Sequence, residues 1–154
     1  MANELTDEID VATADEVLSL FRQTDGQIFN GYKRFEGIQD TGFKRRLEKA
    51  VDCVSLCLAN VMEGKKRSRI IITGAGTSGR IAMLVAAEFN RILKPSLKEP
   101  LFDYLIAGTD AALIKAQEGA EDDPVTGIEE LKAKTQGCDE FITIGITCGL
   151  SAPY

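Results

Sequence analysis

The chain has 154 residues, of which 18 are Lys or Arg and 24 are Asp or Glu, so its net charge is −6. An acidic chain lacks the basic surface that nucleic acids require, which argues against a nucleic-acid partner. With 44% hydrophobic and 27% charged residues, the composition is typical of a soluble globular protein with the length of one ordinary domain.

The sequence gives no sign of a zinc site, a secretory signal or a membrane span. The sequence has no His, and its four Cys residues form no CxxC pair, which argues against a zinc site. The N-terminus is acidic and unlike a secretory signal, and no apolar run reaches the length of a membrane span. We therefore expect a cytoplasmic protein that contacts no membrane.

The first part of the chain has helical patterning. Residues 1–12 are polar and acidic and are predicted to be a mobile lead-in. Residues 13–64 form a predicted helical segment, in which Asp25-Gly26 is expected to interrupt or end the first helix. Apolar residues then recur every three or four positions from Phe43 onward, and Gly64 is expected to terminate this longer helix.

Strands and helices alternate in residues 65–154. Strands are predicted at 70–73, 102–107 and 141–146. Helical patterns between the strands are centred on residues 78–93, 111–116 and 124–137. This order predicts an α/β fold with a parallel sheet and crossover helices. Because little sequence follows the third strand, we expect these residues to form the N-terminal part of a domain, so that the fold is incomplete.

A glycine-rich turn, Gly74-Ala75-Gly76-Thr77-Ser78-Gly79, joins the first of these strands to its helix. Glycines expose backbone N–H groups, and a helix N-terminus carries partial positive charge, so the turn predicts an anion site. The spacing also satisfies the dinucleotide pattern G-x-G-x-x-G, but Asp110 lies too far along to be the acidic residue which that pattern needs. Thr77 and Ser78 instead favour a small phosphate monoester, and a purely structural turn is the other alternative.

Polar residues follow the other two strands, at the edge of the sheet where ligands bind. Thr147 and Ser151 flank Gly149 after the third strand and are candidates for phosphate or sugar oxygens, or for local turn hydrogen bonds. Glu121 is a further candidate, but it belongs to an acidic segment that is equally typical of a solvent-exposed loop. Glu88, on the helix after the glycine-rich turn, is either a surface residue or a carboxylate facing the pocket.

Four segments together resemble one family in order and spacing. They are Gly74-Ala75-Gly76-Thr77-Ser78-Gly79-Arg80, Leu105-Ile106-Ala107-Gly108, Glu118-Gly119-Ala120-Glu121-Asp122 and Gly145-Ile146-Thr147-Cys148-Gly149-Leu150-Ser151-Ala152-Pro153. The chain is similar to the sugar isomerase (SIS) domain family, in the branch shared by glucokinase regulatory protein and N-acetylmuramic acid 6-phosphate etherase. The resemblance implies a three-layer SIS-type, flavodoxin-like fold.

The resemblance also implies a function, namely binding of a phosphosugar of the hexose 6-phosphate type. The residues that it assigns to this ligand are Gly76, Thr77, Ser78, Glu121, Thr147 and Ser151. No cofactor and no metal is expected. If the chain is of the regulator type, the resemblance implies a sugar kinase as its partner. The expected compartment is the cytoplasm, or the nucleus for such a regulator. We expect either a homo-oligomer or a larger chain to complete the pocket.

Some sequence segments are similar to the regulatory protein and others to the etherase. Phe89-Asn90 and Gly149-Leu150-Ser151-Ala152-Pro153-Tyr154 are similar to the regulatory protein. Glu88 with Glu121 is similar to the etherase, where the matching glutamates serve as acid–base catalysts that release lactate. Thr109 departs from both, because the branch usually has a second glycine after Gly108. The resemblance therefore favours a regulator and leaves a lyase as the alternative.

Overall fold

The computed structural model describes residues 4–149 and 152–154, and these divide into two compact units, Met1–Asp52 and Cys53–Tyr154. The elements in chain order are η1 (Glu4–Thr6), η2 (Ile9–Val11), α1 (Ala14–Asn30), α2 (Thr41–Met62), β1 (Ser68–Gly74), α3 (Gly76–Leu93), β2 (Phe102–Ile106), α4 (Ala111–Ile114), η3 (Ala120–Asp122), α5 (Pro124–Thr135) and β3 (Glu140–Gly145).

In the first unit, α1 begins with a capping box. The backbone N–H of Thr13 donates to Glu16 Oε2 over 2.7 Å, and the N–H of Glu16 donates back to Thr13 Oγ1. The expected break at Asp25-Gly26 is wrong, since α1 continues to Asn30. An interior glycine costs a helix only about 1 kcal/mol and keeps its N–H donor. The helix ends instead at Gly31, whose φ of 83° lies in the left-handed region.

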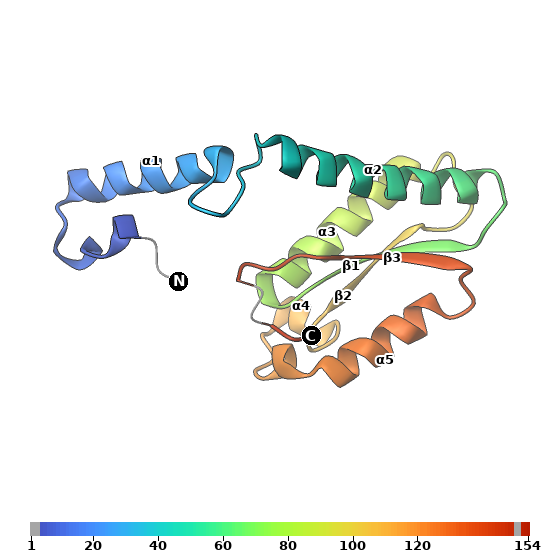
Figure 1. The fold of residues 1–154 in the computed structure, drawn as a ribbon. Coiled ribbons are helices and arrows are strands. Elements are labelled where there is room, and N and C mark those ends of the chain that lie inside the picture. Colours follow the sequence, from blue (N-terminus) through green and yellow to red (C-terminus); the bar gives the residue numbers. More distant parts are fainter. Residues whose placement is uncertain (1–3, 150–151) are drawn as a thin grey trace. The chain divides into compact units, whose positions relative to one another are not determined.

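The second unit is built on a three-stranded parallel sheet with the order β2-β1-β3 (Figure 1). β1 pairs with β2 from Ile70↔Phe102 to Gly74↔Ile106, and with β3 from Ser68↔Glu140 to Thr73↔Gly145. The predicted parallel α/β arrangement is thereby confirmed. Because β1 lies between two strands that follow it in the chain, the two crossovers run in opposite directions.

Helices cover the two faces of this sheet (Figure 1). On one face, Ile70 and Ile72 of β1 pack with Ala82 and Ala86 of α3 and with Cys57 of α2, all buried. On the other face lies α5, whose Lys134 reaches Asp103 of β2. Ile70 and Ile71 of the central strand β1 are fully buried, because helices cover both faces of the sheet.

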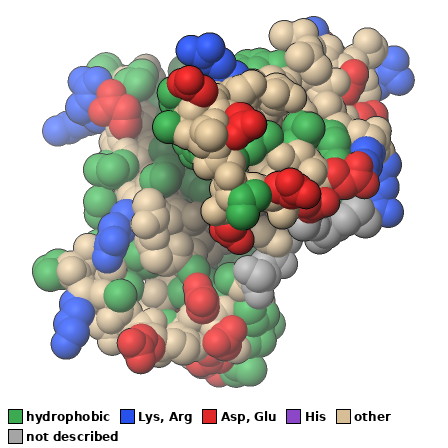
Figure 2. Space-filling model, turned by 90° about the vertical axis from the view of Figure 1, so that its left-hand side faces the viewer, with side chains coloured by type: hydrophobic (Ala, Val, Ile, Leu, Met, Phe, Trp, Pro, Cys, Tyr) green, Lys and Arg blue, Asp and Glu red, His purple; other side chains and the backbone are tan. Residues whose placement is uncertain are grey.

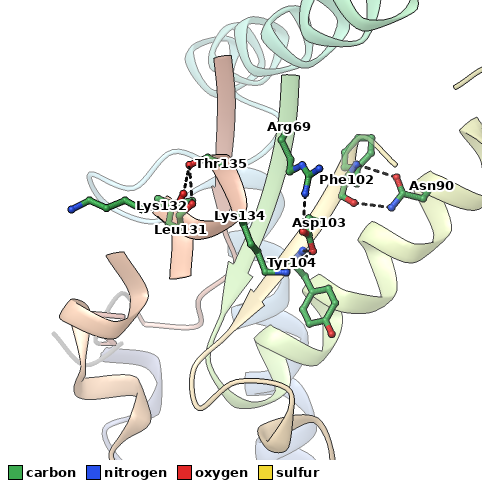
Figure 3. A network of polar contacts seen from close by, with 9 residues as sticks. All are labelled: Arg69, Asn90, Phe102, Asp103, Tyr104, Leu131, Lys132, Lys134 and Thr135. Carbon is green, nitrogen blue, oxygen red and sulfur yellow. Dashed lines mark hydrogen bonds and ion pairs between the residues drawn. The ribbon is translucent and has the colours of Figure 1, made fainter. Parts of the chain in front are cut away.

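A polar network ties the β2 edge of the sheet to its neighbours (Figure 3). Asp103 accepts from Lys134 Nζ over 2.7 Å and pairs with Arg69 Nη1 over 3.4 Å. The side-chain amide of Asn90 donates to the carbonyl of Phe102 and accepts from its N–H, at 2.7 and 3.0 Å. These bonds occupy outer backbone groups of an edge strand, which would otherwise stay unpaired.

The surface carries mixed charge. On the face that Figure 2 shows, Lys and Arg side chains are separated by acidic and uncharged ones and form no continuous basic patch.

Across residues 4–149 and 152–154, every helix is too short or too polar to cross a bilayer.

Candidate functional site

The candidate site lies where the direction of winding of the sheet reverses. β1 and β3 are neighbours, but the chain leaves β1 toward β2 and returns past it to reach β3. Crevices at the carboxyl ends of such strands are the usual ligand sites of open α/β sheets. Here the N–H of Ile146 donates to the carbonyl of Thr73 over 2.8 Å, which holds the two strand ends together at the base of the crevice.

Three glycines shape the turn after β1, two because of close packing and one because of its backbone conformation. A Cβ on Gly74 would lie 2.8 Å from atoms of Ser78, and one on Gly79 would lie 2.4 Å from Cγ1 of Ile106. These two glycines therefore allow α3 to approach the strands closely. Gly76 faces open space, and its φ of 54° is the left-handed conformation that glycine adopts without strain.

The start of α3 offers unpaired donors. The helix begins at Gly76, two residues before the predicted start, so Thr77 and Ser78 lie in its first turn. Its N-cap is Ala75, which has no side chain able to cap, and among the described residues the N–H groups of Gly76 and Thr77 have no acceptor. An 18-residue helix with free N-terminal N–H groups attracts anions.

These elements enclose a cleft of about 260 Å³. Its described lining residues are Thr73, Gly74, Ala75, Ser78, Gly145, Ile146, Thr147, Cys148, Gly149, Ala152 and Tyr154. Among these described residues, Ser78 and Thr147 carry hydroxyl groups and none has a charged side chain. A small anion here would be held by neutral donors and by the helix N-terminus.

The structure thus brings together several of the residues that the sequence predicted. Ser78 and Thr147 line the same cleft, although they are far apart in the sequence, and Gly76 and Thr77 are exposed in the turn beside Ser78. Ser151 lies outside the described residues. Glu121, in η3, is exposed and is absent from the described lining of the cleft. Its backbone carbonyl accepts the N–H of Tyr154, a lining residue, over 3.1 Å.

Glu88 lies elsewhere. It is ten residues beyond Ser78 on α3, about 15 Å along the axis, and it is absent from the described lining of the cleft. Its carboxylate accepts from Arg91 Nε over 2.8 Å and is 56% exposed. Hydrogen bonds from Arg91 lower the pKa of Glu88 below its usual value. The side chain therefore stays ionised near neutral pH.

The segment between β2 and η3 has an unusual backbone. Gly108 and Thr109 both have positive φ, of 86° and 63°. Thr109 thus adopts, despite its branched Cβ, the conformation that a second glycine would favour. The loop is held from outside by Arg80, whose guanidinium donates to the carbonyls of Leu113 and Ala112, both over 3.1 Å.

Sequence reasoning did not assign Cys148 and Tyr154 to the site. Both line the cleft. Cys148 lies between Thr147 and Gly149, so a signal was present in the hydroxyl-rich turn itself. Tyr154 could not be found this way, because its place depends on contacts with α5 and η3.

Fold and cleft together define a class of protein: a doubly wound α/β domain with a ligand crevice beside a glycine-rich helix start. The family model of the glucokinase regulatory protein N-terminal SIS domain matches residues 51–154. The chain belongs to this family.

Relatives match almost the whole chain. Human glucokinase regulatory protein is 35% identical over 157 aligned positions, which cover 99% of this chain and 24% of that protein. The Xenopus laevis regulatory protein is 33% identical, with 99% and 25% covered. N-acetylmuramic acid 6-phosphate etherase of Vibrio atlanticus is 33% identical, with 99% and 44% covered. The chain spans about a quarter of the length of the regulatory proteins it matches.

Proposed function

We propose that the chain binds a phosphosugar of the hexose 6-phosphate type and acts in carbohydrate metabolism as part of a glucokinase-regulator-type protein. The observation that supports this proposal is the cleft between β1 and β3, whose lining includes Ser78, in the first turn of α3, and Thr147. Hydroxyl and backbone N–H donors around a glycine-rich turn suit the oxygens of a phosphate monoester.

Each predicted residue has a role in this proposal. The N–H groups of Gly76 and Thr77 and the hydroxyls of Thr77 and Ser78 bind phosphate from one side. Thr147 and Ser151 bind it from the segment after β3. The role proposed for Glu121 is contact with the sugar hydroxyls. Its backbone carbonyl accepts the N–H of Tyr154, which lines the cleft.

The proposal extends to a partner and an assembly. The regulatory proteins that match the chain are named for glucokinase, so a sugar kinase is the proposed partner. A homo-oligomer or a longer chain is the proposed source of the groups that complete the pocket. The proposed compartment is the cytoplasm, with the nucleus as an alternative for a regulator.

Isothermal titration tests the ligand. Fructose 6-phosphate, glucose 6-phosphate and N-acetylglucosamine 6-phosphate are titrated into the protein, with fructose and inorganic phosphate as controls. We expect heat and a thermal shift with a phosphosugar and none with fructose. If a chain that is folded by circular dichroism gives neither signal at millimolar phosphosugar, the proposal is wrong.

The second candidate function is N-acetylmuramic acid 6-phosphate etherase, which the relatives from Vibrio and other bacteria favour. Elimination of lactate needs a base beside the lactyl carboxylate and an acid at the ether oxygen. Neither Glu121 nor Glu88 belongs to the described lining of the cleft, and Glu88 is exposed and paired with Arg91. The two carboxyl groups are therefore not brought together at the cleft, which makes the regulator the better supported proposal.

Lactate release from N-acetylmuramic acid 6-phosphate tests this second candidate. The regulator proposal expects no release above the protein-free control. If release is seen and Glu88→Gln leaves it unchanged, Glu88 is not part of the acid–base pair. A dinucleotide is the least favoured ligand, because Asp110 lies too far along the chain to be the acidic residue that the dinucleotide pattern needs. NADH fluorescence should therefore not change on addition of the protein.

A further inference from the structure

A groove runs along the C-terminal half of α3, where this helix meets the segment that leads into β2. It consists of two adjoining hollows of about 400 and 350 Å³, which share Ala87, Asn90 and Pro100. Where the hollows meet, the side chain of Asn90 bonds to both backbone groups of Phe102 and joins α3 to β2 (Figure 3). The groove is separate from the cleft between β1 and β3, since the two share no described lining residue.

The lining of the groove is largely apolar. Its apolar side chains include Met83 and Phe102 in the smaller hollow, and Leu93, Leu97 and Pro100 in the larger one. Covering apolar surface is favourable because it removes that surface from water. The groove therefore favours a partner that brings apolar side chains of its own.

Positive charge gathers at the larger hollow. Its charged lining residues are Arg91, Lys94, Lys98 and Glu99. Arg91 is paired with Glu88, whereas Lys94 and Lys98 form no salt bridge within residues 4–149 and 152–154. On a chain whose net charge is −6, this local excess of cations favours an acidic partner.

The first residues of the chain have the complementary charge. Residues 4–11 contain four carboxylates and no Lys or Arg. Glu4 is paired with Lys33. The carboxylates of residues 7, 8 and 10 form no salt bridge or side-chain hydrogen bond within the part of the chain that the structure describes. They are therefore available to cations of another molecule.

The same segment also exposes apolar side chains. Leu5, Ile9 and Val11 are all exposed, and the exposed fraction of Val11 is 78%. Contact with the apolar lining of the groove would remove these side chains from water together with the lining itself. Residues 4–11 thus match the groove both in charge and in apolar character.

We propose that the groove along α3 binds residues 4–11 of a second copy of the chain. The carboxylates of this segment pair with Lys94 and Lys98, and its apolar side chains cover the apolar lining. Because the attraction is between exposed charges, the contact weakens as the salt concentration rises. It differs from pairing at the open edge of β3, since the groove adjoins β2 at the opposite edge of the sheet.

Fluorescence polarisation tests the contact with a peptide. An N-acetylated peptide of residues 4–13, labelled with fluorescein at its C-terminus, is titrated with the chain at low salt, and a scrambled peptide of the same composition serves as comparison. We expect Lys94→Glu combined with Lys98→Glu to raise the Kd of the peptide about tenfold or more. Lys115→Glu combined with Lys132→Glu is the matched control, because it makes the same charge change at exposed lysines outside the groove, and it should leave the Kd unchanged.

Charge exchange between two variants tests whether the segment comes from a second copy. Asp7→Lys with Glu8→Lys reverses the charge of the segment, and Lys94→Glu with Lys98→Glu reverses that of the groove. All proteins also carry Phe141→Lys, which suppresses pairing at the edge of β3. We expect each reversed variant alone to associate less than the Phe141→Lys protein, and their equimolar mixture to regain the association, as measured by size exclusion with light scattering. In the mixture every segment meets a groove of opposite charge only on the other protein.

Several outcomes would overturn the proposal. Absence of peptide binding does so, and so does an equal Kd for the scrambled peptide, which would indicate a groove for any acidic peptide. If the peptide binds but the mixture of reversed variants regains no association, the segment does not bind a second copy. If Phe141→Lys fails to fold, the peptide titration decides the question alone.

Discussion

Ser78 is the single side chain on which the proposed phosphate site depends most, because it lies in the first turn of α3 and lines the cleft. A hydrogen bond to a charged acceptor contributes about 1.5–3 kcal/mol. We therefore expect Ser78→Ala to raise the Kd for fructose 6-phosphate by about 10- to 150-fold. Titration calorimetry measures this, with Ser96→Ala, at an exposed serine outside the cleft lining, as control. An unchanged Kd for Ser78→Ala would remove this hydroxyl from the site.

Thr109 stores strain in the loop after β2. Its φ of 63° places a branched side chain in the left-handed region. We expect Thr109→Gly to raise the free energy of unfolding by about 0.5–1 kcal/mol, after the added freedom of the unfolded chain is subtracted. Urea denaturation measures the change. Thr143→Gly, in the extended strand β3, should instead destabilise the protein, and the same sign for both variants would contradict the strain argument.

Glu140 anchors the start of β3. It accepts from Lys66 Nζ, from Asn60 Nδ2 over 2.9 Å and from Ser68 Oγ over 3.0 Å. These bonds lower its pKa from 4.5 to about 2, with Lys66 as the largest cause. Because the folded-state pKa is the lower one, the stabilisation is present above pH 4.5 and is lost as the pH falls from 4.5 toward 2.

We therefore expect Glu140→Gln to lower the urea midpoint at pH 7 and to lower it much less at pH 3. Lys66→Met provides the check, since Glu140→Gln should have a smaller effect in that background than in the unaltered chain. A difference between the two proteins that stays constant from pH 7 to pH 3 would contradict the pKa assignment.

At the scale of elements, the fit between α3 and the strands rests on Gly79. A Cβ there would come within 2.4 Å of Ile106, which is 2% exposed and cannot move aside. We expect Gly79→Ala to destabilise the protein by about 1–3 kcal/mol through overpacking. Gly26→Ala, inside α1 with open space around it, should not destabilise it. Equal urea midpoints for Gly79→Ala and the unaltered chain would show that α3 can shift.

At the scale of the whole molecule, we expect the open edge of the sheet to govern how the chain associates. Within residues 4–149 and 152–154, β3 pairs with β1 alone, and its Phe141 is 50% exposed. Unpaired apolar edges favour pairing with another chain. We expect association that rises with protein concentration and that Phe141→Lys reduces, measured by size exclusion with light scattering. Leu84→Lys, on the exposed face of α3, is the control. A chain that stays monomeric over the whole range would contradict this.

Local patterns in the sequence were enough to predict most elements of the second unit. Short apolar runs predicted the three strands, and Asp123-Pro124 predicted the start of α5, where Asp123 accepts from the N–H groups of Val125 and Thr126. The glycine-rich turn predicted an anion site beside α3. These features depend on dihedral preferences and hydrogen bonds between residues that are near in the sequence, so they are readable without the fold. The predicted helix break at Asp25-Gly26 was wrong because a single glycine weakens a helix without ending it.

The sequence by itself therefore determined the alternation of strands and helices, the parallel sheet and the glycine-rich start of α3. Only the tertiary structure decided that β1 separates β2 from β3, that Ser78 and Thr147 share one cleft, and that Glu88 pairs with Arg91 away from it. It also decided that the ring of Tyr154 lies against Gly127 of α5. The physical reason is that these placements depend on packing between segments far apart in the chain, for which no local propensity exists.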